Sequence, residues 1–209
     1  MTKLTEFTTD GLVRRMMAGD EEAFTRLYRR LNPPIYRFAL HMSGNTAIAE
    51  DVTQEVFMTL IRDARRFDPA RGSLAAFLFG IARNHLRKRW EQERRILPLA
   101  QGQDGNGNET CALEAKRTLG RPYETSSGDS HDLFASLETI GRVRQAIATL
   151  PQNYREVVVL CELEEMNYED AAAALDCPIG TVRSRLHRAR ALLLEKLREP
   201  EVRARVANE

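Results

Sequence analysis

A glycine-rich stretch near the middle of this 209-residue chain limits its fold more than any other feature. Residues 101–130 read QGQDGNGNETCALEAKRTLGRPYETSSGDS and hold five of the twelve glycines in the chain. Because they also lack apolar periodicity, we predict a flexible linker over residues 97–132. It separates a segment of roughly 96 residues from one of roughly 75, each near the lower size limit for a stable core. The sequence therefore predicts two small domains, over residues 12–96 and 133–199, rather than one large one.

Apolar residues recur at helical spacing in both segments, and neither contains an alternating pattern long enough for a sheet. In the first domain we predict that Asp20 caps a helix that Pro33 and Pro34 bend or interrupt. A second helix is expected over residues 45–64, and a third from the N-cap Ser73 to about residue 95. In the second domain, helices are expected over residues 133–149, 152–163, 168–175 and 180–198. The predicted fold is all-α, with two small helical lobes.

The last two of these helices have the pattern of a helix-turn-helix. Residues 168–175 are rich in alanine, which allows two helices to cross closely, and a short turn leads to a helix dense in arginine. The apolar residues of the second helix must face the core of the lobe, and these are Val182, Leu186, Ala189 and Leu193. The opposite face can then reach base edges in a major groove through Arg183, Ser184, His187 and Arg188. Nearer the phosphates we expect Thr181, Arg185 and Arg190. The alternative is a merely amphipathic basic helix.

Positive charge is concentrated in two segments, although the formal net charge is only +1. Residues 83–95 carry six Lys or Arg against two Glu, and residues 181–198 carry six against one. Two separate basic segments indicate two places that contact a polyanion such as nucleic acid. The alternative is that both are solvated helix faces.

The predicted helix over residues 45–64 carries an acidic surface. Its core stripe is expected to be Ile48, Val52, Val56 and Leu60, at intervals of four residues. This stripe leaves Asp51, Gln54, Glu55 and Met58 on the flanks or outside, with an exposed Phe57 or Met58 beside the acidic patch. Taken alone, the pattern favours a solvated acidic face over a surface that meets a basic partner.

Other features of the sequence exclude several classes of protein. The longest nearly unbroken apolar stretch, residues 74–82, is about half of what crosses a bilayer, and no export signal is visible. Three widely spaced cysteines do not indicate a disulfide framework, so we expect a cytoplasmic protein. The four histidines are scattered and none pairs with cysteines at metal-ligand spacing, so no metal and no cofactor are expected. Without a phosphate loop, a nucleophile elbow or a catalytic carboxylate pair, the chain is not expected to be an enzyme.

Four segments together resemble bacterial sigma factors of the extracytoplasmic-function (ECF, group 4) type. The sequence LDCPIGTVRSRLHRAR at residues 175–190 resembles the helix-turn-helix of the sigma-4 domain, and LPQNYREV at 150–157 resembles the start of that domain. AEDVTQEVF at residues 49–57 is similar to the helix that binds the polymerase clamp, and residues 67–84 resemble the promoter-melting segment of the sigma-2 domain. Just beyond that segment, Trp90 is expected in the core rather than as a stacking platform. The resemblance covers nearly the whole chain except the first dozen residues, the linker and the tail.

The resemblance implies a role for each surface. The last helix would read the −35 promoter element as duplex DNA. The first domain would capture an unstacked base of the −10 element and hold its strand through Phe67, Arg71, Arg83, Asn84, Arg87 and Lys88. Core RNA polymerase would bind Asp51, Gln54, Glu55, Phe57 and Met58.

The partners implied are core RNA polymerase, promoter DNA and an anti-sigma factor. We therefore predict an alternative sigma factor that directs promoter-specific transcription initiation. One alternative is a stand-alone helix-turn-helix regulator, in which the first domain serves as a sensor or dimerisation module. A second alternative is an adaptor or anti-sigma-like protein that binds polymerase without DNA.

Overall fold

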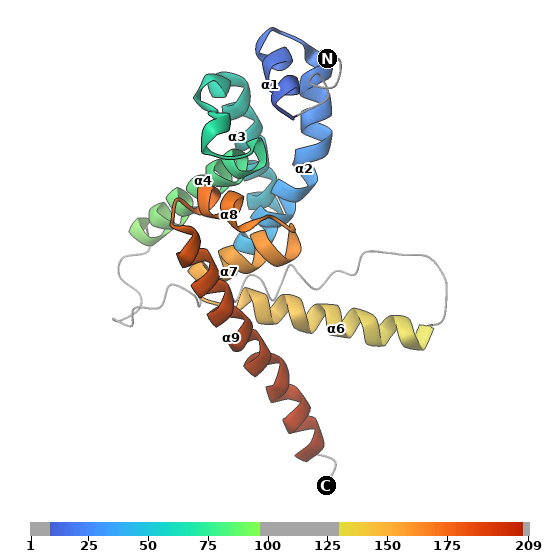
Figure 1. Ribbon diagram of the computed structural model, residues 1–209. Helices are drawn as coiled ribbons and strands as arrows, with labels where there is room; N and C mark the ends of the chain where they lie inside the picture. Colours follow the sequence, from blue (N-terminus) through green and yellow to red (C-terminus); the bar gives the residue numbers. More distant parts are fainter. Residues whose placement is uncertain (1–8, 97–129, 207–209) are drawn as a thin grey trace, which may run out of the picture.

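The computed structural model describes residues 9–96 and 130–206, and within these ranges it contains eight α-helices and no strand (Figure 1). The helices are α1 (Thr9–Met17), α2 (Glu21–Ser43), α3 (Thr46–Asp63), α4 (Leu74–Ile96), α6 (Ser130–Ala148), α7 (Gln152–Val158), α8 (Tyr168–Leu175) and α9 (Ile179–Val206). Helices α1 to α4 form lobe 1, and α6 to α9 form lobe 2. The predicted all-α fold with two lobes is confirmed. Most of the predicted linker lies outside the described residues, and its last three residues instead begin α6.

The long helix α2 begins and ends as its sequence predicts. The Asp20 side chain accepts a hydrogen bond from the Ala23 N–H at 3.0 Å, and Gly44 closes the helix in the left-handed conformation, with φ of 68°. Pro33 and Pro34 do not interrupt it, contrary to one of the two outcomes predicted. Buried apolar residues lie on both sides of the proline pair, so both halves of α2 are anchored to one core.

Lobe 1 is completed by α3, α4 and the short helix α1, which was not predicted from the sequence. Two 3₁₀ turns, Ala64–Arg66 and Pro69–Arg71, connect α3 to α4. The Ser73 hydroxyl oxygen accepts from the Ala76 N–H at 3.2 Å, which confirms Ser73 as the cap of α4. Helix α1 packs against α2 through the buried side chains of Leu12 and Val13.

Lobe 2 is built around a buried cation, Arg155, on α7. Its guanidinium donates to the carbonyl oxygens of Leu150 at 3.0 Å and Ala148 at 2.5 Å, where α6 ends, and to that of Met42 at 3.2 Å, where α2 ends. A cation at a helix C-terminus satisfies carbonyl groups that lack partners within the helix. Arg155 therefore ties the ends of helices from both lobes together.

The helix-turn-helix occupies the end of lobe 2. The Asn167 side chain accepts from the Asp170 N–H at 2.7 Å and caps α8, and Asp176 ends α8 in the left-handed conformation. In α9 the predicted core residues Val182, Leu186 and Ala189 are buried, and Leu193 is partly buried against the core.

The two lobes pack directly on one another. Helix α8 lies against α4 (Figure 1). The buried side chains of both lobes form one continuous cluster. His41 of α2 lies at this junction; burial lowers its pKa to about 4, with further lowering by Arg144, Arg37 and Arg155.

Candidate functional site

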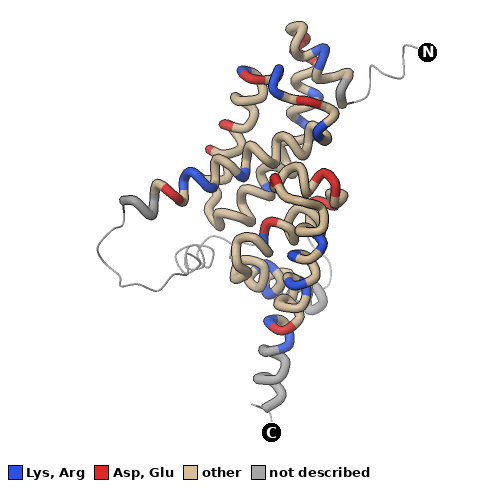
Figure 2. Tube along the Cα trace, turned by 60° about the vertical axis from the view of Figure 1, so that its left-hand side comes forward, with Lys and Arg blue, Asp and Glu red and all other residues tan. Residues whose placement is uncertain are grey.

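The reading face of the helix-turn-helix lies open to solvent on α9. Arg183, Ser184, His187 and Arg188 are all exposed, whereas Thr181 and Arg185 are half-buried. The Ser184 hydroxyl donates to the Thr181 carbonyl oxygen at 3.1 Å. Figure 2 shows Lys and Arg along α9 and along the outer half of α4. The structure thus brings the four side chains predicted to reach base edges onto one exposed face.

Two arginines of α9 are held by residues that the sequence analysis did not single out. The Arg190 guanidinium donates to Glu162 Oε1 from Nε at 3.1 Å, and this hydrogen bond raises the pKa of Arg190. The guanidinium carbon of Arg183 lies 5.9 Å from the centre of the Tyr168 ring, within the range of a cation–π contact. Glu162 belongs to an acidic run in the sequence, but only the fold shows which cation it meets.

The side chains predicted to hold the −10 strand do not all lie together. Asn84, Arg87 and Lys88 are exposed on α4, and Arg71 is exposed at the end of the second 3₁₀ turn. Arg83, one turn before Arg87, has a side chain only 18% exposed, and it pairs with Glu156 of lobe 2. Its predicted phosphate contact is therefore blocked in this arrangement of the lobes.

The aromatic residues of this region are packed rather than free. Phe67 is half-buried, with its ring centre 5.7 Å from that of Phe77. Trp90 is half-buried and packs against the core, in agreement with its expected core position. A base that stacked on Phe67 would therefore meet only the part of the ring that Phe77 leaves open.

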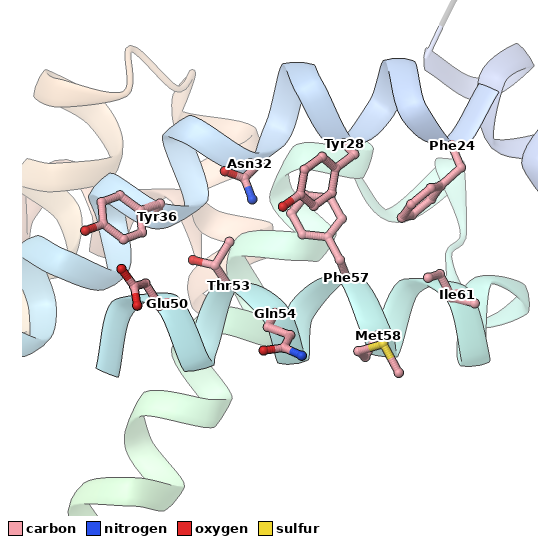
Figure 3. Close-up of a pocket in the computed structure, with 10 residues that line it drawn as sticks. All are labelled: Phe24, Tyr28, Asn32, Tyr36, Glu50, Thr53, Gln54, Phe57, Met58 and Ile61. Atoms are coloured by element: carbon pink, nitrogen blue, oxygen red, sulfur yellow. The ribbon is translucent and has the colours of Figure 1, made fainter. Parts of the chain in front are cut away.

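A groove of about 550 Å³ lies between α2 and α3 (Figure 3). Its lining is mixed aromatic, aliphatic and polar, and consists of Phe24, Tyr28, Asn32, Tyr36, Glu50, Thr53, Gln54, Phe57, Met58 and Ile61. On the outer face of α3 beside it, Asp51, Gln54 and Glu55 are exposed, and Met58 is 53% exposed. Asp51 Oδ2 accepts from Arg89 Nη1 of α4 at 3.2 Å.

Phe57 is not an exposed residue, although it was one of the two candidates for exposure. It is only 3% exposed, and its ring centre lies 4.7 Å from that of Tyr28 and 6.5 Å from that of Phe24. Figure 3 shows Tyr28 and Phe57 pointing toward one another across the groove. Phe57 therefore forms the floor of the groove, and Met58 provides the exposed apolar side chain.

A two-lobed helical chain whose second lobe presents a basic helix-turn-helix belongs, by its geometry, among the DNA-binding proteins of transcription. Comparison with known families is more specific. Residues 27–96 match Sigma-70 region 2, and residues 140–193 match Sigma-70, region 4. None of the helices in the described part of the chain is long and apolar enough to cross a membrane.

Similar proteins carry the same identification. The chain is 32% identical to the ECF RNA polymerase sigma factor EcfG of Rhodopseudomonas palustris (strain TIE-1), over 77% of each chain. It is 30% identical to the ECF RNA polymerase sigma-E factor of Escherichia coli (strain K12), over 95% of this chain and 98% of that protein. The chain therefore belongs to the ECF family of RNA polymerase sigma factors. It is an alternative sigma factor that directs transcription initiation, and the stand-alone regulator is not favoured.

Two solved structures share its fold. One is the sigma factor RpoE in complex with the anti-sigma factor NepR from Bartonella quintana, with a TM-score of 0.59 and 24% identity, covering 84% of this chain and 97% of that one. The other is CnrH in complex with the cytosolic domain of CnrY, with a TM-score of 0.59 and 23% identity, covering 89% of this chain and 94% of that one.

Proposed function

We propose that this sigma factor reads its two promoter elements with separate lobes and binds core RNA polymerase mainly through α3. The main observation in support of the proposal is the exposed basic face of α9, which follows the helix-turn-helix turn after α8. Val182, Leu186 and Ala189 of this helix are buried, and its four predicted reading side chains are exposed. A recognition helix requires this division of faces, because one side must pack on the lobe while the other enters the groove.

On α9, Arg183 and Arg188 would read guanines and Ser184 and His187 would contact neighbouring base edges in the −35 duplex. Thr181, Arg185 and Arg190 would contact phosphates. The ion pair with Glu162 orients Arg190 along the helix surface, and Tyr168 restrains Arg183 near the start of α9. Restrained side chains lose less entropy on binding, which favours a fixed reading register.

The −10 element would be held as a single strand by α4 and the turn that precedes it. Asn84 offers both a donor and an acceptor to one base, while Arg87 and Lys88 offer charge to the backbone. Phe67 and Arg71 lie in the connecting turns, where an unstacked base would enter. Arg83 would join them once its contact with lobe 2 is broken.

Core polymerase would meet the outer face of α3 and the adjoining groove. Asp51 and Glu55 supply negative charge for a basic partner, while Met58 and Ile61 add exposed apolar area at the rim. Gln54 and the buried ring of Phe57 line the groove between α2 and α3. We further propose that an anti-sigma factor covers this surface, that the protein acts in the cytoplasm and that it has no catalytic activity of its own.

Run-off transcription with purified core polymerase on a promoter library tests this assignment. The wild-type protein should select a set of promoters with a recurrent −35 and −10 sequence. His187→Ala with Arg188→Ala should strongly weaken discrimination at the −35 positions that these two side chains read, since each good base contact contributes about 1–3 kcal/mol. Polymerase binding should remain normal. Arg198→Ala, which removes one exposed charge farther along α9, serves as the control and should keep the wild-type promoter preference.

The polymerase surface is tested in the same assay by Asp51→Arg with Glu55→Arg. Like charges across an interface cost several kcal/mol, so core polymerase should no longer co-purify with the double variant. Glu195→Arg, an exposed charge reversal on lobe 2, is the control. If the double variant still assembled with polymerase and transcribed normally, α3 would not be the docking surface.

A further inference from the structure

Lobe 2 places a buried carboxylate on the surface of lobe 1 that is proposed above to hold the −10 strand. The Arg83 Nε–H donates to Glu156 Oε2 at 3.0 Å, and the Glu156 side chain is only 1% exposed. Gln152 donates from Nε2 to the other carboxylate oxygen, Oε1, at 3.0 Å. Glu156 is thus oriented within lobe 2 by Gln152 and aimed at the guanidinium of Arg83.

A second carboxylate of lobe 2 lies at the N-terminus of α4. The backbone N–H of Ser73 donates to Asp170 Oδ1 at 3.0 Å. The start of a helix attracts anions, because its first N–H groups lack partners within the helix and its dipole is positive there. Ser73 and Arg83 are ten residues apart, so the two contacts are about 15 Å apart along the helix axis.

The fit between α4 and α8 leaves no room for a strand of nucleic acid. A Cβ atom added to Gly80 would lie 3.5 Å from the carbonyl oxygen of Ala174, and one added to Gly72 would lie 3.1 Å from the Cβ of Ala173. Figure 1 shows α8 against α4. The inner half of α4 is therefore covered, whereas Asn84, Arg87 and Lys88 farther along stay exposed.

We propose that lobe 2 inhibits the −10 surface of the free protein without any partner, with Glu156 and Asp170 occupying positions that phosphates of the single strand would take. A carboxylate and a phosphate oxygen are both anionic acceptors, so each pairs well with a guanidinium or with a helix N-terminus. This inference rests on the proposed −10 surface, because Arg83 must serve the strand once the lobes separate.

The exposed cations of α4 allow a single strand to bind before the lobes separate. A single strand can first bind Arg87 and Lys88 and then compete with Glu156 for Arg83. Because the closed lobes and the bound strand exclude one another, the strand must shift the protein toward the open form, and opening must in turn raise its affinity for the strand.

The test uses the full-length protein and a fluorescently labelled single-stranded DNA of random sequence. Glu156→Gln keeps the side-chain shape but removes the charge. A hydrogen bond between charged groups is commonly worth about a factor of ten or more in an equilibrium, so we expect about tenfold tighter binding. Small-angle X-ray scattering should show a larger radius of gyration for the variant, and for the wild type after DNA is added. Glu169→Gln makes the same charge change at an exposed position on α8 and should change neither quantity.

A wedge tests the closed state without altering charge. Gly80→Leu would push against the backbone of Ala174 and open the lobes, while Gly80→Ala adds only a Cβ at ordinary contact distance and is its control. Trp90 fluorescence would report whether lobe 1 stays folded. The proposal is supported if the opened variants have larger radii of gyration and bind DNA more tightly. The tighter binding should be lost again when Arg83→Ala is added to Glu156→Gln.

Two results would overturn the inference. The first is a wild-type protein whose scattering is already that of separated lobes. The second is that the variants open but do not bind DNA more tightly. In that case, Arg87→Ala in the opened protein shows whether the inhibition by lobe 2 or the −10 surface itself is wrongly assigned. If Arg87→Ala weakens binding, the −10 surface stands and only its inhibition by lobe 2 is refuted. If it has no effect, the proposed −10 surface itself is wrong.

Discussion

Replacing the buried cation of lobe 2 should destabilise the protein in a way that distinguishes its two lobes. Arg155 is 3% exposed, and its guanidinium donates to the Ala148 and Leu150 carbonyls within lobe 2 and to the Met42 carbonyl of lobe 1. Arg155→Met keeps much of the apolar length but removes every donor. Three carbonyl oxygens at helix ends then lose a charged partner in a region with little access to water.

The magnitude follows from opposing contributions. Each hydrogen bond from a charged donor contributes about 1.5–3 kcal/mol, so three would sum to roughly 4.5–9 kcal/mol. Removing the buried cation returns several kcal/mol of desolvation penalty. We expect a net loss of about 3 kcal/mol, equivalent to a shift of about 1–2 M in the urea midpoint. Two of the three acceptors belong to lobe 2, so that lobe should carry the larger share.

Two spectroscopic probes distinguish the loss of stability in lobe 1 from that in lobe 2. The single tryptophan of the chain, Trp90, lies on α4 and reports lobe 1, whereas far-UV circular dichroism reports the helices of both lobes. Arg155→Met should shift the circular dichroism midpoint more than the Trp90 midpoint. Arg155→Lys, which keeps the charge but not the forked donors, should lose less than Arg155→Met. If Arg155→Met lost less than about 0.5 kcal/mol, the carbonyl network would not be the stabilising feature described here.

Two more predictions concern lobe 1. Phe57→Ala should lower the free energy of unfolding by about 3–5 kcal/mol, because it removes the buried ring that packs against Tyr28. Met58→Ala, at an exposed position, should change it by no more than about 0.5 kcal/mol. Equal urea midpoints for the two variants would contradict this difference in burial. The pKa of His41 is lowered to about 4 by burial, then by neighbouring arginines, against 6.5 in the unfolded chain. The unfolded state therefore takes up its proton first, and stability should fall as the pH drops from 6.5 toward 4, by at most about 3 kcal/mol. Urea midpoints measured across this range should fall less steeply for His41→Gln, and parallel curves would count against the assignment.

The helices and the recognition face could be predicted from the sequence because local rules determine them. Helix α8 begins and ends as predicted, and α9 buries Val182, Leu186 and Ala189 as its apolar spacing requires. The caps at Asp20 and Ser73 depend only on residues within one turn.

The position of Phe57 shows where a simple periodicity fails. Residues four apart advance by about 40° around a helix, so a row at intervals of four drifts across the surface. The buried face of α3 in fact runs through Ala49, Thr53 and Phe57 as well as Val52 and Val56, and Ile48 is only half-buried. A pattern that includes intervals of three would have placed Phe57 inside.

The role of Arg83 could not be predicted, because its partner lies 73 residues away in the other lobe. The sequence shows a basic segment around Arg83, but Glu156 is the only acidic residue in residues 151–161, and neither periodicity nor composition indicates that the two meet. The same holds for Arg37, whose guanidinium donates to Glu164 from Nε at 2.9 Å across the lobes. Such pairs depend on tertiary packing, which local patterns do not determine.

These ion pairs between the lobes show where some of the opposite charges of this nearly neutral chain meet. Acidic residues of lobe 2 meet basic residues of lobe 1 at Arg37 and Arg83, so part of the charge on each lobe is neutralised inside the molecule. Each lobe is also small, and its buried residues join one cluster that spans both. Separation of the lobes therefore exposes apolar area and unpairs charges at the same time. An interaction that opens the protein must contribute enough free energy to offset both losses, and a polyanion that replaces the lost carboxylates offsets the second directly.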